Sequence, residues 1–168
     1  MVLIEKKTAK IMSYTAEVKY LPACIVYYQQ GIVPSLADIP AFVLRAAEEC
    51  RKANPDLRCV EPGYCYTAYP EVCSETNVQI EYGQAVEEAG CETETIRFRE
   101  LESIPAVCVL HHGDYANLGE AYRFAFGWAL EHGYEVSAPP REQYIHGAWD
   151  RENPEEWLTE VQIPVQKR

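Results

Sequence analysis

Long apolar runs, paired cysteines and the common nucleotide or metal motifs are all missing from this sequence. No stretch of 18 apolar residues occurs, so we expect no membrane-spanning helix. The seven cysteines are odd in number and lack C-x-x-C spacing, which argues against a secreted disulfide framework and against a structural zinc site. H-E-x-x-H, P-loop, Rossmann and G-x-S-x-G patterns are also absent. We therefore predict no metal and no cofactor.

Positive charge is also scarce. The chain has 15 Lys and Arg against 26 Asp and Glu, and its formal net charge is -11. A nucleic-acid groove or an anionic membrane surface needs clustered basic residues, so we expect no direct partner of either kind. The apolar run at the start is too short for the core of a signal peptide, which predicts a cytoplasmic protein. The acidic balance mildly favours cationic small molecules.

The sequence contains a repeated pattern. Residues 81–86 read EYGQAV and residues 160–165 read EVQIPV, and each stretch begins with glutamate and ends with valine. LPACIVYYQQG at 21–31 likewise corresponds to IPAVCVLHHG at 104–113. A helical pattern, a Pro-containing break and a Tyr-rich strand follow in both cases. The repeat predicts one domain over residues 1–168, built from two halves at about 14–88 and 94–166.

Hydrophobic periodicity predicts an α+β fold. One helix is expected from residue 39 or 40 to 52, and a second after Asn117, with Glu120 placed to complete a capping box. Strands are expected at 14–29, 64–70, 77–87, 94–112, 142–149 and 157–166, with a bend in the fourth at residues 103–105. The result would be an antiparallel sheet of six to eight strands with two helices on one face and a concave second face.

Alternation along the strands places two glutamates on that concave face. Val161, Ile163 and Val165 form an apolar row that should pack on the helices, so Glu160 points the other way. The same reasoning applies to Glu81. Several aromatic residues were expected around them: Tyr64, Tyr66, Tyr69, Tyr144, Trp149 and Trp157. A carboxylate among aromatic rings can hold an organic cation.

Three stretches resemble the GyrI-like family, whose members include the effector-binding modules of AraC-type and MerR-type multidrug regulators. They are HHGDYANLGEAYRFAFGWALEHGY at 111–134, PPREQYIHGAWD at 139–150 and EEWLTEVQIPV at 155–165. The last resembles the family's C-terminal strand. With the internal repeat, the resemblance extends over roughly residues 14–166.

The resemblance implies a pocket between the halves that receives lipophilic, often cationic, aromatic ligands through a glutamate with aromatic neighbours. By motif position that glutamate is Glu160, and Tyr144 and Trp149 occupy the aromatic positions of the preceding strand. Glu81 matches only through the internal repeat. About a dozen residues precede the first predicted strand, too few for a DNA-binding domain, so the resemblance implies a standalone member.

Three classes of function stay open. The first is a small-molecule-binding protein that senses or sequesters its ligand. The second is a hydrolase of strained cyclopropane-containing electrophiles, in which Glu160 would be the general base and Tyr144 or Tyr66 would position or protonate the substrate. The third is a protein-interaction module similar to the family's gyrase inhibitors. Nothing in the sequence excludes a homodimer.

Overall fold

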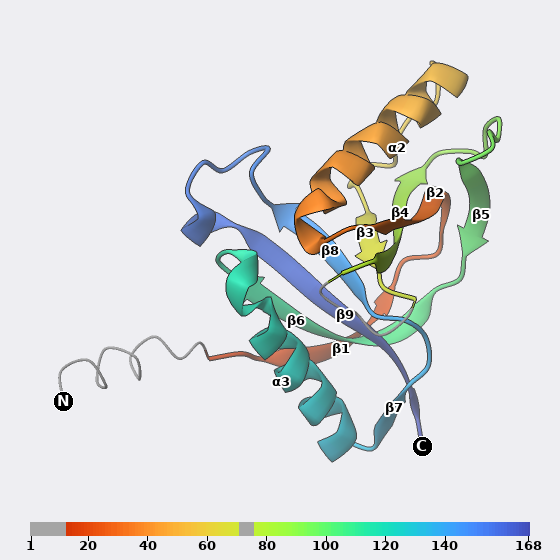
Figure 1. Ribbon diagram of the computed structural model, residues 1–168. Helices are drawn as coiled ribbons and strands as arrows, with labels where there is room; N and C mark the ends of the chain where they lie inside the picture. Colours follow the sequence, from red (N-terminus) through yellow and green to blue (C-terminus); the bar gives the residue numbers. More distant parts are fainter. Residues whose placement is uncertain (1–12, 71–75) are drawn as a thin grey trace.

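The computed structural model describes residues 13–70 and 76–168. Within these ranges it contains nine strands and two α-helices (Figure 1). In chain order they are β1 (Ala16–Leu21), β2 (Cys24–Val33), α2 (Ile39–Ala53), β3 (Cys65–Ala68), β4 (Val78–Val86), β5 (Arg97–Leu101), β6 (Ile104–His112), α3 (Leu118–Glu131), β7 (Tyr134–Val136), β8 (Arg141–His146) and β9 (Leu158–Lys167). Short 3₁₀ turns at Leu36–Asp38 and Tyr115–Asn117 lead into the two helices.

The strands form one curled antiparallel sheet. Its order is β1-β6-β9-β8-β3-β4-β2-β5, with β7 added beside β9. This order reads the same from both ends if β1 is matched with β5, β6 with β2, β9 with β4 and β8 with β3. The first strand of each half of the chain pairs with a strand of the other half: β1 pairs with β6, and β5 pairs with β2. Strands β8 and β3 therefore meet at the centre of the sheet.

Both helices lie on one face of the sheet, which we call the helix face. Helix α2 is amphipathic, and its buried Phe42 and Ala46 pack with Ile80 of β4. Helix α3 places the small side chains of Ala121 and Ala125 against Val161 and other apolar residues of β9, which allows close approach. The predicted α+β class, with two helices on one face of an antiparallel sheet, is confirmed.

The opposite side of the sheet, which we call the far face, is buried without a helix. Val26, Tyr64, Tyr66, Ala68 and Ala85 form one apolar cluster there. Leu21, Ala106 and Cys108 form another. Among the described residues, the side chains packed against the first cluster are Cys24, Tyr28, Val60 and Leu101, and Ile104 packs against the second, so neither cluster includes a helix residue.

Several local predictions differ from the structure. The strand predicted at 14–29 is two strands, because the chain breaks at Pro22 between β1 and β2. The strand β7 was not predicted. The capping box at Asn117 is wrong: Asn117 makes no cap hydrogen bond, and the preceding 3₁₀ turn is capped by Asp114, which accepts from the Ala116 amide at 3.0 Å. The predicted bend near residue 103 is present between β5 and β6.

Strand pairing also corrects the alignment of the two halves. Glu81 lies opposite Gln30, and Glu160 lies opposite Leu110. These pairs match Gln30 with Leu110, so Ala106 corresponds to Val26. The shared Pro-Ala dipeptide had instead suggested that Ala106 corresponds to Ala23.

Among the described residues, neither helix is long and apolar enough to cross a membrane.

Candidate functional site

Glu142 lies at the centre of the helix face. It is the second residue of β8, where it pairs with Val161 of β9 and Thr67 of β3. Side chains of paired residues share a face, so Glu142 points to the same side as Val161, which contacts helix α3. In Figure 1, β8 runs between the two helices. The carboxylate therefore lies where the two halves of the sheet meet.

Three tyrosine hydroxyls donate hydrogen bonds to this carboxylate. Tyr144 and Tyr69 donate to Oε1 at 2.8 and 3.2 Å. Tyr122 of helix α3 donates to Oε2 at 2.5 Å. Strand pairing makes Tyr69 the counterpart of Tyr144, because Ala68 pairs with Glu81 and Gln143 pairs with Glu160.

Within the described residues, Glu142 has no cationic partner. The side chain is only 5% exposed, and among the described residues no Lys, Arg or His lies within 4 Å of its oxygens. Burial raises the pKa of Glu142, and the hydrogen bonds from Tyr122, Tyr144 and Tyr69 offset part of that rise. A buried carboxylate with only neutral donors is poised to accept either a proton or a cation.

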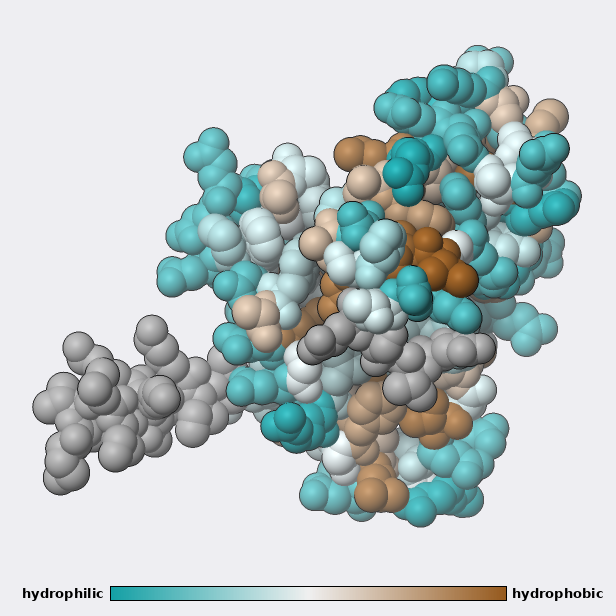
Figure 2. All heavy atoms as spheres, in the orientation of Figure 1, coloured by the Kyte–Doolittle hydropathy of each residue, from teal (hydrophilic) through white to brown (hydrophobic). Residues whose placement is uncertain are grey.

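Aromatic rings extend from this carboxylate. Tyr144 contacts Tyr115 with ring centroids 5.9 Å apart, and Tyr115 contacts Trp157 at 5.1 Å. Figure 2 shows that hydrophobic atoms gather toward the middle of this side of the molecule, while hydrophilic atoms cover most of its periphery. The buried hydroxyl of Thr159, opposite Tyr144 in the sheet, makes no hydrogen bond to any described residue. The surroundings of Glu142 are thus mainly aromatic.

Only some of the predicted aromatic residues belong to this cluster. Tyr144 and Tyr69 contact the carboxylate of Glu142, and Trp157 reaches it through Tyr115. Trp149 lies apart: it is 63% exposed, and its ring covers Gly147, where an added Cβ would come within 2.2 Å of the indole. Tyr64 and Tyr66 belong to the far face.

The two predicted glutamates are on the far face, and each has its own cation. Glu160 accepts from Lys19 Nζ at 2.8 Å and from Gln162 Nε2 at 2.8 Å. Glu81 forms a close ion pair with Arg99 and accepts from Tyr66 at 2.8 Å and from Gln30 at 2.9 Å. Each glutamate is 5% exposed. The orientation agrees with the prediction, but the carboxylates are buried and their charge is already balanced.

The residues proposed for hydrolysis are not brought together. Gln143 pairs with Glu160 and Tyr144 pairs with Thr159, so Glu160 and Tyr144 project to opposite faces of the sheet. Tyr66 is on the same face as Glu160, but its hydroxyl donates to Glu81. The structure therefore contains no contact between Glu160 and either tyrosine.

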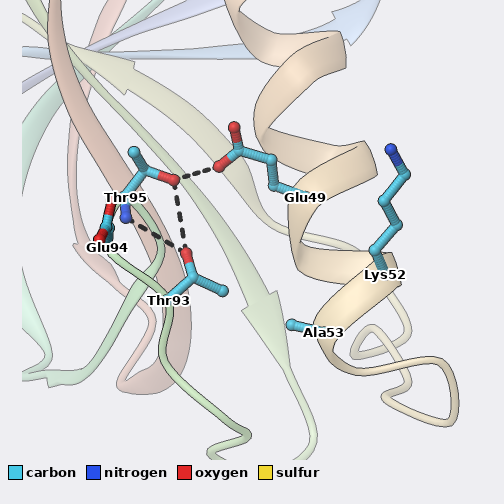
Figure 3. A pocket seen from close by; sticks show the side chains of 6 residues that line it. All are labelled: Glu49, Lys52, Ala53, Thr93, Glu94 and Thr95. Carbon is cyan, nitrogen blue, oxygen red and sulfur yellow. Dashed lines mark hydrogen bonds between the residues drawn. The ribbon is translucent and has the colours of Figure 1, made fainter.

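Two hollows lined by described residues lie away from Glu142. The larger, of about 500 Å³, is at the C-terminal end of α2 and is lined by Glu49, Lys52, Ala53, Thr93, Glu94 and Thr95 (Figure 3). Figure 3 shows Lys52 directed away from the threonines, so the residues do not converge on one point. A hollow of about 240 Å³ lies against α3. Within residues 13–70 and 76–168, no group of His, Cys, Asp and Glu could hold a metal ion.

Glu142 is the candidate site residue that sequence reasoning missed. REQYIH has no apolar row that assigns its faces, and the neighbouring Glu160 fitted the expected motif position. The available signal was the E-x-Y spacing, since residues two apart in a strand share a face. That spacing places Glu142 and Tyr144 side by side, but only the pairing with β9 shows that they face the helices.

The chain is similar to structures of regulators and small-molecule-binding proteins. It shares 37% identity with the crystal structure of the EcmrR C-terminal domain, at TM-score 0.89 over 94% of this chain and 100% of that one. An EcmrR–DNA complex gives 38% identity and TM-score 0.90, over 99% of this chain but only 63% of that chain. SAV2435 bound to tetraphenylphosphonium shares the fold, with 18% identity, TM-score 0.56, and coverage of 92% of this chain and 94% of that one.

No curated protein matched the chain by sequence. The model of the GyrI-like small molecule binding domain matches residues 15–166, which include every strand and helix up to the last residues of β9. The chain belongs to the GyrI-like family of small-molecule-binding domains.

Proposed function

We propose that this domain binds a lipophilic organic cation, with Glu142 supplying the negative charge, and so senses or sequesters such compounds. One observation carries the proposal: a carboxylate that is 5% exposed accepts three tyrosine hydroxyls and has no cation within 4 Å among the described residues. Burial of an ion without an opposite charge is unfavourable, and a bound cation would supply that charge.

The surrounding tyrosines favour an aromatic or lipophilic ligand over a small metal ion. Aromatic rings attract organic cations through their faces and offer apolar contact area, whereas hard metal ions need several oxygen ligands. Oε1 of Glu142 already accepts from two hydroxyls, whereas Oε2 accepts from Tyr122 alone. We expect a ligand to approach Oε2, with the Tyr122 side chain turning away.

Binding should depend on pH through Glu142. Only the ionised carboxylate attracts a cation, so a proton and the ligand compete for it. Because burial raises the pKa of Glu142, this competition extends above the usual range of a glutamate. The affinity for a cation should fall as the pH is lowered through that raised pKa.

The test is a titration with tetraphenylphosphonium, followed by intrinsic fluorescence and calorimetry. The probe is chosen because SAV2435, which shares the fold, was solved with it bound. We expect Glu142→Gln to weaken binding at least about tenfold, roughly 1.4 kcal/mol. Glu160→Gln is the matched control: this side chain is equally buried but already paired with Lys19, so binding should change by less than about twofold.

The same pair of variants can contradict the proposal. If Glu160→Gln abolishes binding and Glu142→Gln does not, the ligand occupies the far face, as the motif alignment predicts. Triphenylphosphine oxide, which is neutral and of similar shape, separates charge from hydrophobic contact. Its binding should be similar in the wild type and in Glu142→Gln. An equal loss for the neutral and cationic probes would mean that the substitution disturbed the packing around residue 142 and did not act through its charge.

A further inference from the structure

Arg141 is a second buried charge, next to Glu142 in the chain but on the opposite face of the sheet. It pairs with Gln162 and Ala68, both far-face residues. Its side chain is only 9% exposed. The guanidinium carbon lies 5.2 Å from the centre of the Tyr66 ring, and Nη1 donates to the Tyr64 hydroxyl at 3.1 Å. Arg141 is thus held between two aromatic residues.

No carboxylate balances this arginine. Among the described residues, no Asp or Glu oxygen lies within 4 Å of its guanidinium, and Tyr64 accepts its one side-chain hydrogen bond. A guanidinium has five N–H donors in a planar fork that fits a carboxylate through two parallel hydrogen bonds. One of these donors is used by Tyr64, and no other Arg141 nitrogen is a fully buried atom without a partner, so the remaining donors are accessible to an anion.

The two nearby glutamates cannot supply the missing charge. Glu160 is paired with Lys19 and hydrogen-bonded to Gln162, whose own carbonyl accepts from Tyr64. Glu81 is paired with Arg99 on the other side of Arg141. Lys19 also lies 3.8 Å from the exposed Glu17, so Lys19 and Arg99 both have carboxylate partners. Of the three cations Lys19, Arg99 and Arg141 on the far face, Arg141 is the one with no described carboxylate within 4 Å.

We propose that the far face binds a small organic monocarboxylate, held by the Arg141 guanidinium and packed against the rings of Tyr64 and Tyr66. One guanidinium without a carboxylate partner is matched by one carboxylate, whereas a phosphate dianion would add further negative charge close to Glu81 and Glu160. The walls are aromatic and aliphatic, because Val26 and Ala85 belong to the same cluster. An aromatic or aliphatic body therefore suits this site better than an inorganic anion.

Two further cations flank Arg141. Lys19 of β1 and Arg99 of β5 reach inward from the two edge strands, and their side chains are 43% and 38% exposed. Both are already paired with carboxylates, so Arg141 is left as the cation available to an anion. Gly83 contributes to the shape: an added Cβ there would lie 2.5 Å from the Tyr66 ring, so glycine lets that ring lie against β4 beneath Arg141.

Titration with sodium benzoate, with sodium sulfate for comparison, tests the proposal. We expect benzoate to raise the melting temperature of the full chain in a concentration-dependent way and to bind at least about tenfold more tightly than sulfate. Arg141→Met, which keeps an apolar stem, should weaken benzoate binding at least about tenfold. Arg45→Met removes an exposed positive charge from α2 and should leave benzoate binding unchanged.

A direct signal covers the case in which Arg141→Met does not fold. The Nε–H resonance of Arg141 is assigned as the arginine side-chain resonance that is missing from spectra of Arg141→Lys. In the wild type, this resonance should shift on addition of benzoate. The other arginine resonances should move less. Equal benzoate binding by wild type and Arg141→Met would overturn the proposal. So would the absence of any shift of that resonance at about 10 mM benzoate, since sites of this kind bind more tightly than that.

Discussion

The buried carboxylates on the two faces of the sheet have different kinds of partner. On the far face, Glu81 and Glu160 are each 5% exposed, and each is paired with a cation from an edge strand. On the helix face, Glu142 is equally buried but has only tyrosine hydroxyls as partners. The same burial thus accompanies balanced carboxylates on one side of the sheet and an unbalanced carboxylate on the other.

The difference separates structural carboxylates from a carboxylate suited to bind a ligand. Glu81 and Glu160 occupy matching places in the two halves, and the cations that balance them, Arg99 and Lys19, come from the matching strands β5 and β1. Glu142, in contrast, corresponds to Thr67, which is neutral and pairs directly with it. The Glu81–Arg99 and Glu160–Lys19 pairs can stabilise the sheet. Glu142 has no matching carboxylate in the other half, and among the described residues no cation lies within 4 Å of it.

Replacing Arg99 with methionine should remove the difference between Glu81 and Glu142, because Glu81 would then also be a buried carboxylate without a cation. Glu81 would keep only the neutral donors Tyr66 and Gln30. We expect the free energy of unfolding at neutral pH to fall by about 2 kcal/mol, less than for a fully buried pair because Arg99 is 38% exposed. Urea denaturation measures this change.

The control for that substitution is Arg97→Met on the same strand. Arg97 is exposed and lies 3.7 Å from the exposed Glu92, so its loss should change the free energy of unfolding by less than about 0.5 kcal/mol. Equal effects of the two substitutions would show that the Arg99–Glu81 pair contributes no more than a surface contact.

Glu142→Gln, unlike Arg99→Met, should raise the free energy of unfolding at neutral and higher pH. A carboxyl with a raised pKa keeps its proton in the folded state after the unfolded chain has lost it, so wild-type stability falls as the pH rises from the ordinary glutamate pKa through the raised value. The amide removes this loss. The variant should gain about 1.4 kcal/mol for each unit by which the pKa is raised.

Thermal unfolding of wild type, Glu142→Gln and Glu160→Gln at pH 4 and pH 8 tests this sign. The advantage of Glu142→Gln over the wild type should be small at pH 4 and larger at pH 8. Glu160→Gln should show no such growing advantage, because it removes one partner of the Lys19 ion pair. A constant difference between Glu142→Gln and wild type at both pH values would mean that the substitution acts through packing alone.

Much of the fold could be predicted from the sequence because burial leaves a periodic trace. The alternation of Val161, Ile163 and Val165 indicated which side of β9 faces a helix, and that assignment is confirmed. The break at Pro22 had the same local signal as the bend predicted at residues 103–105, a proline in an apolar stretch, but it was not predicted. The exchange of β1 and β5 between the halves depends on which strands pair, and pairing partners distant in the chain leave no local pattern.

The site was harder to predict than the fold for the same reason. Sequence alternation correctly gave Glu160 an orientation away from the helices, but it did not reveal Lys19, which is 141 residues away and balances its charge. It also did not reveal that Tyr122 of α3 reaches Glu142. Whether a carboxylate is available to a ligand depends on such distant contacts, so identifying glutamates next to aromatic residues was not enough.

The most direct test is to measure the pKa of Glu142 by NMR of the side-chain carboxyl carbon, assigned with Glu142→Gln, with and without tetraphenylphosphonium. The account predicts a pKa above the ordinary range of a glutamate in the free protein and a fall toward or below that range when the cation binds. An ordinary or lowered pKa in the free protein, unchanged by the cation, would contradict the claim that Glu142 is an unbalanced buried carboxylate that binds the ligand.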